Sequence, residues 1–348
     1  MSNPYDKVDN SQAVNLNTMS VPQLFDLLER TVMSNDHIKS TVQMFGDRVS
    51  PLYMKKAFVP NTGQFMSLTE QDMQTYGNEQ PEGTNPIFAK YGIGRTLAFT
   101  FTDYGNAFQS TARARLTMKH ADVVAKWADL PRLLIERRYL DGVHRLTFGT
   151  SASYTNMDGT IKDNRCIDGL SPFNASHTLP FSSDTYTNIV PSNPVFSKNA
   201  LLAAELLFKT EIKDGFGVQQ NIEPNTLIST NDPTLVYNIR QIMGSTTEVG
   251  QANSAVINTL TRYRHVILPR LDSDANGAYD SAKKDMWILG RFGGTDGVRM
   301  FFTQPVGIRY RKTDVNNLNG DITIAVEGSW EFRVADPRGM VMSSGVGS

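Results

Sequence analysis

Residues 322–334 alternate between apolar and mostly polar positions, and this stretch constrains the fold more than any other. The even positions are all apolar or glycine: Ile322, Ile324, Val326, Gly328, Trp330, Phe332 and Val334. Period-two alternation is typical of a β-strand with one dry face and one wetter face. At roughly 3.3 Å per residue the strand would span about 43 Å, whereas ordinary strands have about 5–6 residues. The sequence therefore predicts an elongated unit built around this strand.

Length and charge limit the classes of function that remain. The chain has 348 residues, which suggests about two domains. Its formal net charge of −1 argues against a dedicated DNA or membrane binder, because phosphate binding needs a surplus of Lys and Arg. The single cysteine, Cys166, excludes an internal disulfide framework and suits a reducing cytoplasm. No run of about 18 apolar residues is present, so no membrane span is expected.

Both helices and strands are predicted along the chain. Residues 1–19 read as an extended polar arm, and strands at 52–59 and 97–102 would flank a projecting hairpin. Residues 106–146 are rich in helix formers and predict one long helix with a kink or break near Pro131. Two further helices are predicted, at 199–213 with Ser197 as its cap and from 233 with Asp232 as its cap. Short strands are predicted at 227–229, 266–268, 286–289 and 307–311, and a glycine-rich turn at 293–297.

The best local motif for a metal is Asp272-Ser-Asp274-Ala-Asn276-Gly277, whose start matches a calcium loop. The twelfth position of such a loop needs a bidentate glutamate, and here it is Lys283. An Asx-rich surface turn explains the same residues. The histidines show no spacing typical of metal ligands, so neither a metal site nor a cofactor is predicted.

Motifs for catalysis are equally weak. Cys166 and His177 are eleven residues apart in a loop-rich section, so a nucleophilic dyad is one interpretation and inert packing is the other. Gly92-Ile-Gly94 lacks the third glycine and the βαβ setting of a dinucleotide-binding loop. The absence of a catalytic constellation in a chain of this size favours a structural protein, not an enzyme.

The long predicted helix carries an excess of basic residues. Between 113 and 145 there are eight Lys or Arg (113, 115, 119, 126, 132, 137, 138 and 145) and four Asp or Glu (122, 129, 136 and 141). A solvated helix face with ion pairs would explain the pattern. The alternative is a weakly basic surface that faces nucleic acid.

Four stretches carry a resemblance to a known family: Asp168-Gly-Leu-Ser-Pro-Phe-Asn-Ala-Ser-His177, the segment 223–230 before the Asp-Pro helix, Val266-Ile-Leu-Pro-Arg-Leu-Asp272 followed by 287–289, and 330–337. In this order they resemble segments of the Mu-like major head subunits. The chain is thus similar to the major capsid proteins of tailed bacteriophages, which share the Hong Kong 97 (HK97) fold. The resemblance covers nearly the whole chain from about residue 20.

The resemblance implies an α+β, HK97-like fold with a defined layout. Residues 1–47 would be the N-terminal arm, and 48–103 an extended loop that lies over a neighbouring subunit. Residues 104–196 and 301–336 would form the peripheral domain, with the helix 106–146 as its spine. The long strand would form a hairpin with 307–311 beside this helix and pack its apolar face on it. The axial domain would take 197–300 and 337–348.

The implied function is that of a major capsid protein. It would assemble as hexamers and pentamers into an icosahedral shell around double-stranded DNA, in the host cytoplasm, and reside in the virion. Portal protein and scaffolding or decoration proteins would be further partners, and DNA contact would be weak and non-specific. A noncovalent shell is expected, because no lysine aligns with a cross-linking site.

Two sets of residues are the candidate sites. The candidate assembly contacts lie in the extended loop: Lys55, Lys56, Phe58, Phe65, Glu70 and Asp72. The candidate DNA-facing residues lie on the spine helix: Arg113, Arg115 and Lys119. Two alternatives remain open, namely another virion protein such as a tail-tube subunit, and a soluble enzyme that uses Cys166/His177 or the Asp-rich loop.

Overall fold

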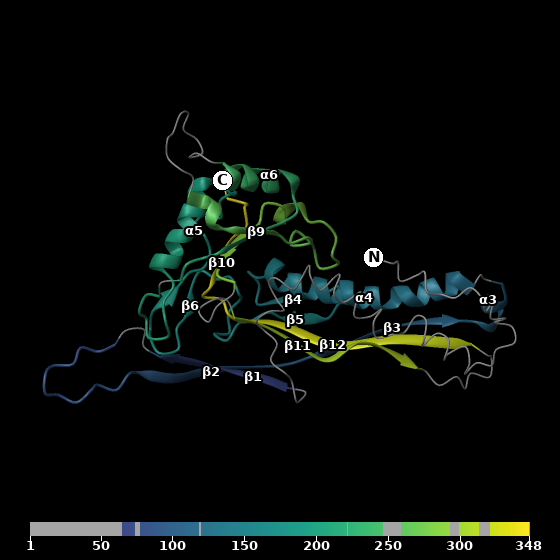
Figure 1. Ribbon diagram of the computed structural model, residues 1–348, viewed down its shortest axis with the longest axis horizontal. Coiled ribbons are helices and arrows are strands. Elements are labelled where there is room, and N and C mark those ends of the chain that lie inside the picture. Colours follow the sequence, from purple (N-terminus) through teal and green to yellow (C-terminus); the bar gives the residue numbers. More distant parts are fainter. Residues whose placement is uncertain are drawn as a thin grey trace, which may run out of the picture. The chain divides into compact units, whose positions relative to one another are not determined.

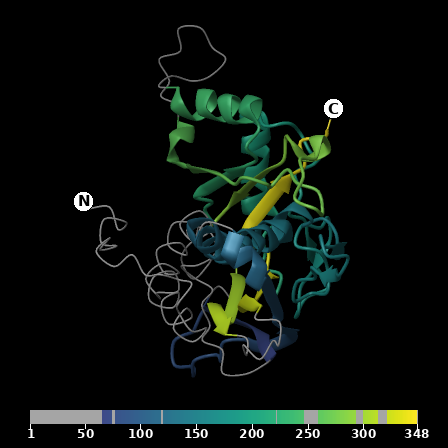
Figure 2. The ribbon, with the colours of Figure 1, turned by 90° about the vertical axis from the view of Figure 1, so that its right-hand side faces the viewer.

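The computed structural model of the protein divides into two compact units (Figures 1 and 2). The described part of the first unit lies within Asp103–Glu136 and Val306–Ser329. The second unit comprises Gly46–Thr102, Arg137–Pro305 and Trp330–Ser348. The structure describes the following residues: 65–73, 77–117, 120–220, 222–245, 259–292, 299–312 and 321–347. The predicted arm, the strand at 52–59 and a glycine-rich turn at 293–297 therefore lie outside the described residues.

A three-stranded sheet dominates the first unit, in the order β11-β12-β3. Its strands are β11 (Arg299–Lys312), β12 (Ile322–Asp336) and β3 (Thr102–Ser110). Asp321 fastens one end of the sheet, because its carboxylate accepts hydrogen bonds from Gln109 Nε2 at 2.9 Å and from the backbone N–H of Ala112 at 3.1 Å. The predicted pairing of the strand at 307–311 with the long strand is confirmed.

The alternation in β12 has the predicted meaning. Ile324, Val326, Trp330, Phe332 and Val334 are all at most 2% exposed. In the second unit, the indole Nε1 of Trp330 donates to Asp141 Oδ2 at 2.9 Å. A Cβ at Gly142 would lie 3.2 Å from the ring of Phe332, so the strand and the helix are in close contact. The prediction that this face packs on the long helix is confirmed for these two aromatic residues.

The predicted single helix at 106–146 is wrong in its first part. Residues up to Ser110 belong to β3, and helices α3 (Ala112–Thr117) and α4 (His120–Thr147) follow. Helix propensity is a weak prior, and pairing of β3 with β12 overrides it. Pro131 lies inside α4 and does not end it.

A four-stranded sheet forms the core of the second unit, in the order β13-β10-β8-β9. The strands are β8 (Thr226–Ser229), β9 (Arg264–Ile267), β10 (Trp287–Gly290) and β13 (Met340–Ser343). β10 is antiparallel to both β8 and β13, whereas β8 and β9 are parallel. All residues of β8, β10 and β13 are buried, which explains why apolar side chains stand at consecutive positions in each of these strands.

Helices α5 (Lys198–Thr210) and α6 (Pro233–Gly244) pack with this sheet in one apolar core, seen at the top of Figure 1. Ser197 accepts a hydrogen bond from the N–H of Ala200, and Asp232 accepts from those of Thr234 and Leu235, so both helices are capped as expected. Short elements complete the unit: hairpins β4–β5 (Ser153–Thr155, Ile161–Asp163) and β6–β7 (His177–Thr178, Thr185–Tyr186), and 3₁₀ turns η2 (Thr259–Arg262) and η3 (Ser281–Lys283).

Mixed helices and largely antiparallel sheets confirm the predicted α+β class. Among the described residues, no helix is both long and apolar enough to cross a membrane. The predicted boundaries of the arm, the extended loop and the peripheral and axial domains stay a prediction.

Candidate functional site

The antiparallel hairpin of β1 (Phe65–Met73) and β2 (Tyr91–Thr100) carries a long exposed loop. The described part of the connecting segment, 77–90, is drawn in Figure 1 as an open loop beyond the two strands, and every residue of it is exposed. Connections between strands of a hairpin usually have about 2–5 residues. A loop of this length with no buried side chain points to a function outside the unit that carries it.

Four large apolar side chains are exposed within a seven-residue stretch of this hairpin, 87–93. Ile87 is 61% exposed, Phe88 96%, Tyr91 57% and Ile93 64%. We call these four residues the hairpin patch. Single exposed apolar residues are ordinary, but several within a short segment are typical of a surface that binds another protein.

A β-bulge determines which side chains of β2 face solvent. β2 has one residue more than β1 between paired positions, so Gly94 and Arg95 both oppose Glu70. An extra residue reverses the faces of a strand. Tyr91 and Ile93 precede the bulge and are exposed, whereas the odd-numbered residues directly after it are half-buried.

The two glycines of Gly92-Ile-Gly94 allow the hairpin to approach the rest of the second unit. A Cβ on Gly92 would lie 2.4 Å from the ring of Phe181, which real Cβ atoms do not tolerate. A Cβ on Gly94 would lie 3.0 Å from both Pro180 Cβ and a carboxylate oxygen of Glu70. These glycines therefore serve close packing of the strand, not phosphate binding.

Glu70 and Arg95 form one polar contact in the part of the hairpin that is nearer its loop. Arg95 Nε lies 3.4 Å from Glu70 Oε2, and the guanidinium also donates to the hydroxyl and the carbonyl of Thr178 at 2.8 and 2.7 Å. Glu70 is only 8% exposed. Burial raises the pKa of its carboxyl group, although Arg95 and Arg338 act against that shift.

A second polar contact joins β1 to the segment after β12. Arg338 Nη1 donates to Asp72 Oδ2 at 2.8 Å, and its Nε and Nη2 donate to the carboxylate of Asp336 at 2.9–3.1 Å. Asp72 Oδ2 also accepts from the N–H of Gly215 at 2.8 Å. Burial alone would lower the pKa of Arg338, but the carboxylates of Asp336 and Asp72 raise it well above its ordinary value.

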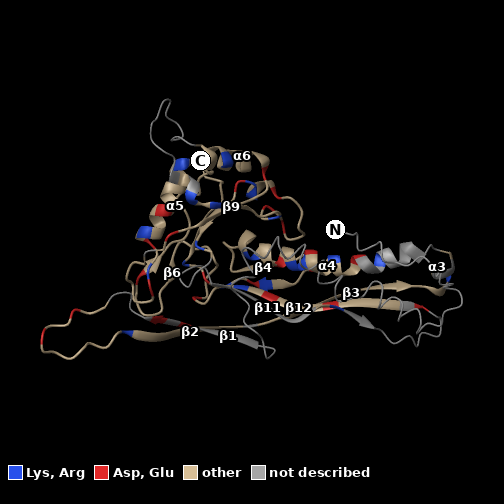
Figure 3. Cartoon of the chain, in the orientation of Figure 1, with Lys and Arg blue, Asp and Glu red and all other residues tan. Residues whose placement is uncertain are grey.

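A third charged cluster connects α4, β5 and β12 within the second unit. Figure 3 shows basic and acidic residues along α4 and β12. Arg145 Nη2 lies 2.5 Å from Glu331 Oε1, and both side chains are at most 5% exposed. Arg333 lies 3.5 Å from the same carboxylate and 3.4 Å from that of Asp163, and burial lowers its pKa. The cluster joins three elements across the wetter face of β12 and is structural in character.

The Asp-rich loop is a surface turn. Asp274 Oδ1 accepts from the N–H groups of Asn276 and Ala278 at 2.9 and 2.8 Å, and Asp280 Oδ1 accepts from that of Ala282 at 3.0 Å. These carboxylates hold the backbone of their own loop. No group of three or more His, Cys, Asp or Glu side chains suited to a metal occurs among the described residues.

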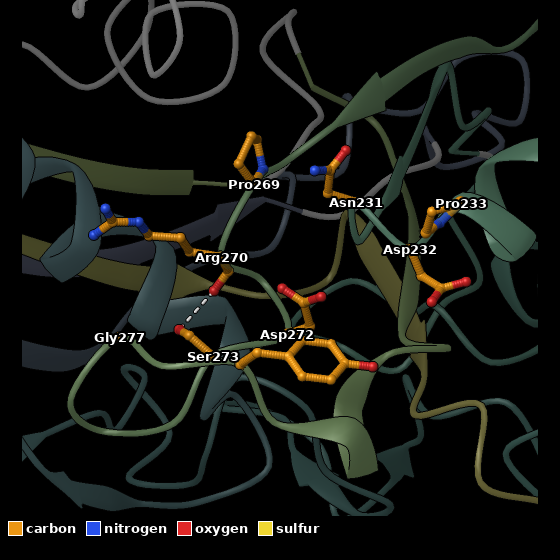
Figure 4. A pocket seen from close by; sticks show the side chains of 9 residues that line it. Asn231, Asp232, Pro233, Pro269, Arg270, Asp272, Ser273 and Gly277 are labelled. Atoms are coloured by element: carbon orange, nitrogen blue, oxygen red, sulfur yellow. Dashed lines mark hydrogen bonds between the residues drawn. The ribbon is translucent and has the colours of Figure 1, made fainter.

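An open hollow of about 460 Å³ adjoins this loop (Figure 4). Asp272 and Asp232 contribute carboxylates to its lining, and Ser273 Oγ donates to the carbonyl of Arg270 at 2.7 Å. Burial, reinforced by Asp232 and Asp280, raises the pKa of Asp272. The Oγ of Ser273 lies 3.1 Å from Nε2 of His144, but Ser273 is 1% exposed and its hydroxyl donates to the carbonyl of Arg270, so the hollow presents no accessible nucleophile.

The Cys166/His177 pair has no features of a nucleophilic dyad. His177 Nδ1 lies 2.6 Å from Asp168 Oδ2, and its ring stacks on Tyr186 with a centroid distance of 4.8 Å. Burial raises the pKa of the Cys166 thiol well above its ordinary value, whereas a reactive thiol needs a lowered one. The motif between Asp168 and His177 therefore closes a loop through its two end residues.

Comparison with known families decides the class of protein. The family described as phage capsid protein matches residues 94–343, well over half of the chain.

The chain belongs to the phage capsid protein family.

Solved structures with a similar fold include that of Mycobacterium phage Patience, at 13% identity, with 94% of this chain and 89% of that chain covered and a TM-score of 0.48. The capsid of Ralstonia phage GP4 matches at 10% identity, with 82% and 85% covered and a TM-score of 0.48. The SrpI encapsulin of Synechococcus elongatus PCC 7942 matches at 13% identity, with 94% and 91% covered and a TM-score of 0.46. Comparison with curated proteins finds no match.

The family match confirms the predicted tailed-phage major capsid protein. The protein is a structural subunit that associates with copies of itself into an icosahedral shell, and it resides in the virion. The match also answers the tail-tube alternative, because it assigns the chain to the shell.

The predicted assembly contacts of this capsid protein are only partly described. Lys55, Lys56 and Phe58 lie outside the described residues. Phe65 starts β1, opposite Thr100. Glu70 and Asp72 have ion-pair partners within the chain, as given above, so their use between subunits stays a prediction. Sequence reasoning missed the hairpin patch, although its residues form an apolar group in an otherwise polar loop.

The basic excess of the spine helix divides into two groups. Arg138 and Arg145 are at most 3% exposed, and Arg137 pairs with Asp141 at 3.0 Å and with Asp158 at 3.2 Å. The other group lies towards the start of the helical region, where Arg113 is exposed. Arg115 lies in α3, and Lys119 is outside the described residues. Three of the eight basic residues thus have a structural explanation.

Proposed function

We propose that this capsid protein builds its shell from hexamers and pentamers around double-stranded DNA, with the β1–β2 hairpin as an extended loop over a neighbouring subunit. The observation that carries the proposal is the hairpin patch, because four large apolar side chains lie exposed on a segment with no buried side chain of its own. Family membership supports a second copy of the chain as the partner.

The patch suits an interface that is repeated many times. Full burial of one large apolar side chain contributes about 1.5–3 kcal/mol before the cost of ordering the loop is subtracted. Each contact is therefore modest by itself. A subunit in a closed shell makes several contacts at once, and multivalency turns modest contacts into a stable assembly.

The substitution Phe88→Ser tests the hairpin contact. Phe88 is 96% exposed in the single chain, so we expect a normally folded subunit that fails to form closed shells. Ile161→Ser is the matched control, since Ile161 is also strongly exposed, at 76%, but lies in β5 away from the hairpin. Circular dichroism would report the fold, and sedimentation with negative-stain microscopy would report the shells. Normal shells from Phe88→Ser would contradict the proposal.

The basic start of the spine is proposed to face the packaged DNA. Exposure of Arg113, and the involvement of the later arginines in buried pairs, supports this part of the helical region as the candidate. Charge reversal at Arg113, Arg115 and Lys119 should leave empty shells intact and reduce DNA retention. Particles that retain DNA as the parent protein does would contradict the assignment.

The remaining proposals concern the layout and the partners. The arm, the extended loop and the peripheral and axial domains would have the boundaries given by the resemblance. Assembly would take place in the host cytoplasm, with a portal at one vertex and with scaffolding or decoration proteins as further partners.

A further inference from the structure

The paired strands of the β1–β2 hairpin end at Met73 and Tyr91, and this end, which we call the base of the loop, is held by side chains that are distant in sequence. Arg338 reaches Asp72 across a sequence separation of 266 residues. It is 7% exposed, and its other donors are taken up by Asp336. Asp72 in turn accepts from the N–H of Gly215, so one carboxylate fastens β1 to two other segments of the second unit.

The donors of the Arg338 guanidinium fix the relative orientation of its two carboxylate partners in addition to attracting them. An arginine has a planar fork of donors, so binding two carboxylates at once restricts their relative position as well as their distance. The carboxylate of Asp336 takes Nε and Nη2, which leaves Nη1 pointing at Asp72. The orientation of the guanidinium is therefore set by one partner and transmitted to the other.

Two neighbouring contacts act in the same sense. Arg95, on β2, donates to Thr178 at 2.7 and 2.8 Å, and Gly92 allows the strand to lie against Phe181. The ring of Phe181 is itself stacked on Phe216 with a centroid distance of 5.0 Å. The base of the loop is thus packed and hydrogen-bonded, whereas residues 77–90 beyond it are all exposed.

We propose that Arg338 is a positioning residue for shell assembly, which locks the base of the loop through Asp72 so that the hairpin patch meets the neighbouring subunit in one direction. The inference rests on the proposed role of the hairpin. It adds that the hairpin is held rigidly and that a buried ion pair, not the contact surface alone, sets the direction in which its loop projects. Shell geometry depends on that direction, because every subunit contacts its neighbour through the same hairpin.

Asp72→Asn is the direct test. It removes the charge that Arg338 meets on β1 and leaves the Arg338–Asp336 pair in place, so the unit should still fold. We expect the amides of β2 and of Gly215 to exchange hydrogen on the order of tenfold faster or more in the unassembled subunit, since one charged hydrogen bond is lost. Assembly should then give shells of mixed size or open sheets. Asp158→Asn is the control, because it breaks the pair with Arg137 at 3.2 Å without touching the hairpin.

A covalent lock makes the test independent of any loss of stability. A Cβ on Gly215 would lie 3.0 Å from the Cβ of Asp72, and a disulfide needs about 3.5–4.5 Å, so a small shift permits the bond. In the double variant Asp72→Cys/Gly215→Cys, the hairpin is locked when oxidised and unlocked when reduced. We expect uniform shells from the oxidised protein and mixed products from the reduced one.

Each outcome bears on one proposal. Uniform shells from Asp72→Asn, or faster exchange without any change of the shells, would overturn the positioning role. The same mixed products from the oxidised and the reduced form of Asp72→Cys/Gly215→Cys would also overturn it. Normal shells from Phe88→Ser would instead overturn the hairpin contact on which it rests.

Discussion

His144 offers a quantitative test of how burial acts in this protein. It lies in the last turn of α4 and is 0% exposed. Its Nε2 lies 3.1 Å from Ser273 Oγ, and the rings of Phe148 and Tyr154 meet it edge-on with centroid distances of 5.2 and 5.8 Å. Burial lowers the pKa of His144 to about 4, although Asp141 acts in the opposite direction.

The sign and size of the effect follow from the two pKa values. In the unfolded chain the imidazole has a pKa of about 6.5, so below that pH the unfolded state takes up a proton that the folded state resists. The stability that depends on a neutral His144 is fully present above about pH 7.5 and is lost as the pH falls towards 4. At pH 4.5 the calculated loss is about 2.5 kcal/mol for this one group.

Urea unfolding of the unassembled subunit measures this loss. Trp287 and Trp330 are at most 1% exposed, so tryptophan fluorescence reports the transition. The comparison is between the parent protein and His144→Gln, which cannot titrate, at pH 7.5 and 4.5. We expect the parent to lose about 2.5 kcal/mol more than the variant between these two pH values.

The variant also serves as its own control. Any stability that the substitution costs at pH 7.5 is present at both pH values and cancels in the difference. The carboxylates that both proteins share titrate in both, so their effect on stability also cancels in the difference. Equal losses in the parent and in His144→Gln would show that burial does not hold this histidine neutral, and would refute the reasoning.

Two further predictions concern contacts that are buried. Glu331→Gln should lower the free energy of unfolding by about 3 kcal/mol in the urea assay, because Arg145 loses its buried counter-charge. Glu327→Gln on the same strand should lower it by less than about 1 kcal/mol, because its partner Arg309 is 63% exposed. Equal losses from the two substitutions would contradict this. Gly92→Ala should lower it by about 1–3 kcal/mol through overlap with Phe181, and Phe181→Leu should recover part of that loss in the double variant, whereas strictly additive effects would rule out the contact.

The clearest success of sequence reasoning concerns elements whose signals are local. The long strand was predicted at 322–334 and extends over Ile322–Asp336, because its alternation is written in consecutive residues. Helices α5 and α6 were predicted with their caps, since capping depends on side chains within three residues of the helix start. The order of short motifs also led to the correct family.

The failure at β3 has a different physical origin. Residues 106–110 have no strong strand pattern, and their neighbours favour a helix. Pairing with β12, more than 200 residues further along the chain, supplies the backbone hydrogen bonds that make them a strand. No local window contains that partner.

The sequence by itself determined the long strand, the capped helices and, through the order of its motifs, membership of a capsid family. Only the tertiary structure decided how the candidate site is built. Gly92 and Gly94 acquire a role when Phe181 and Pro180 lie against them, and Asp72 acquires one when Arg338 meets it. Periodicity and capping act between near neighbours, whereas close packing and buried ion pairs join residues that only the folded chain brings together.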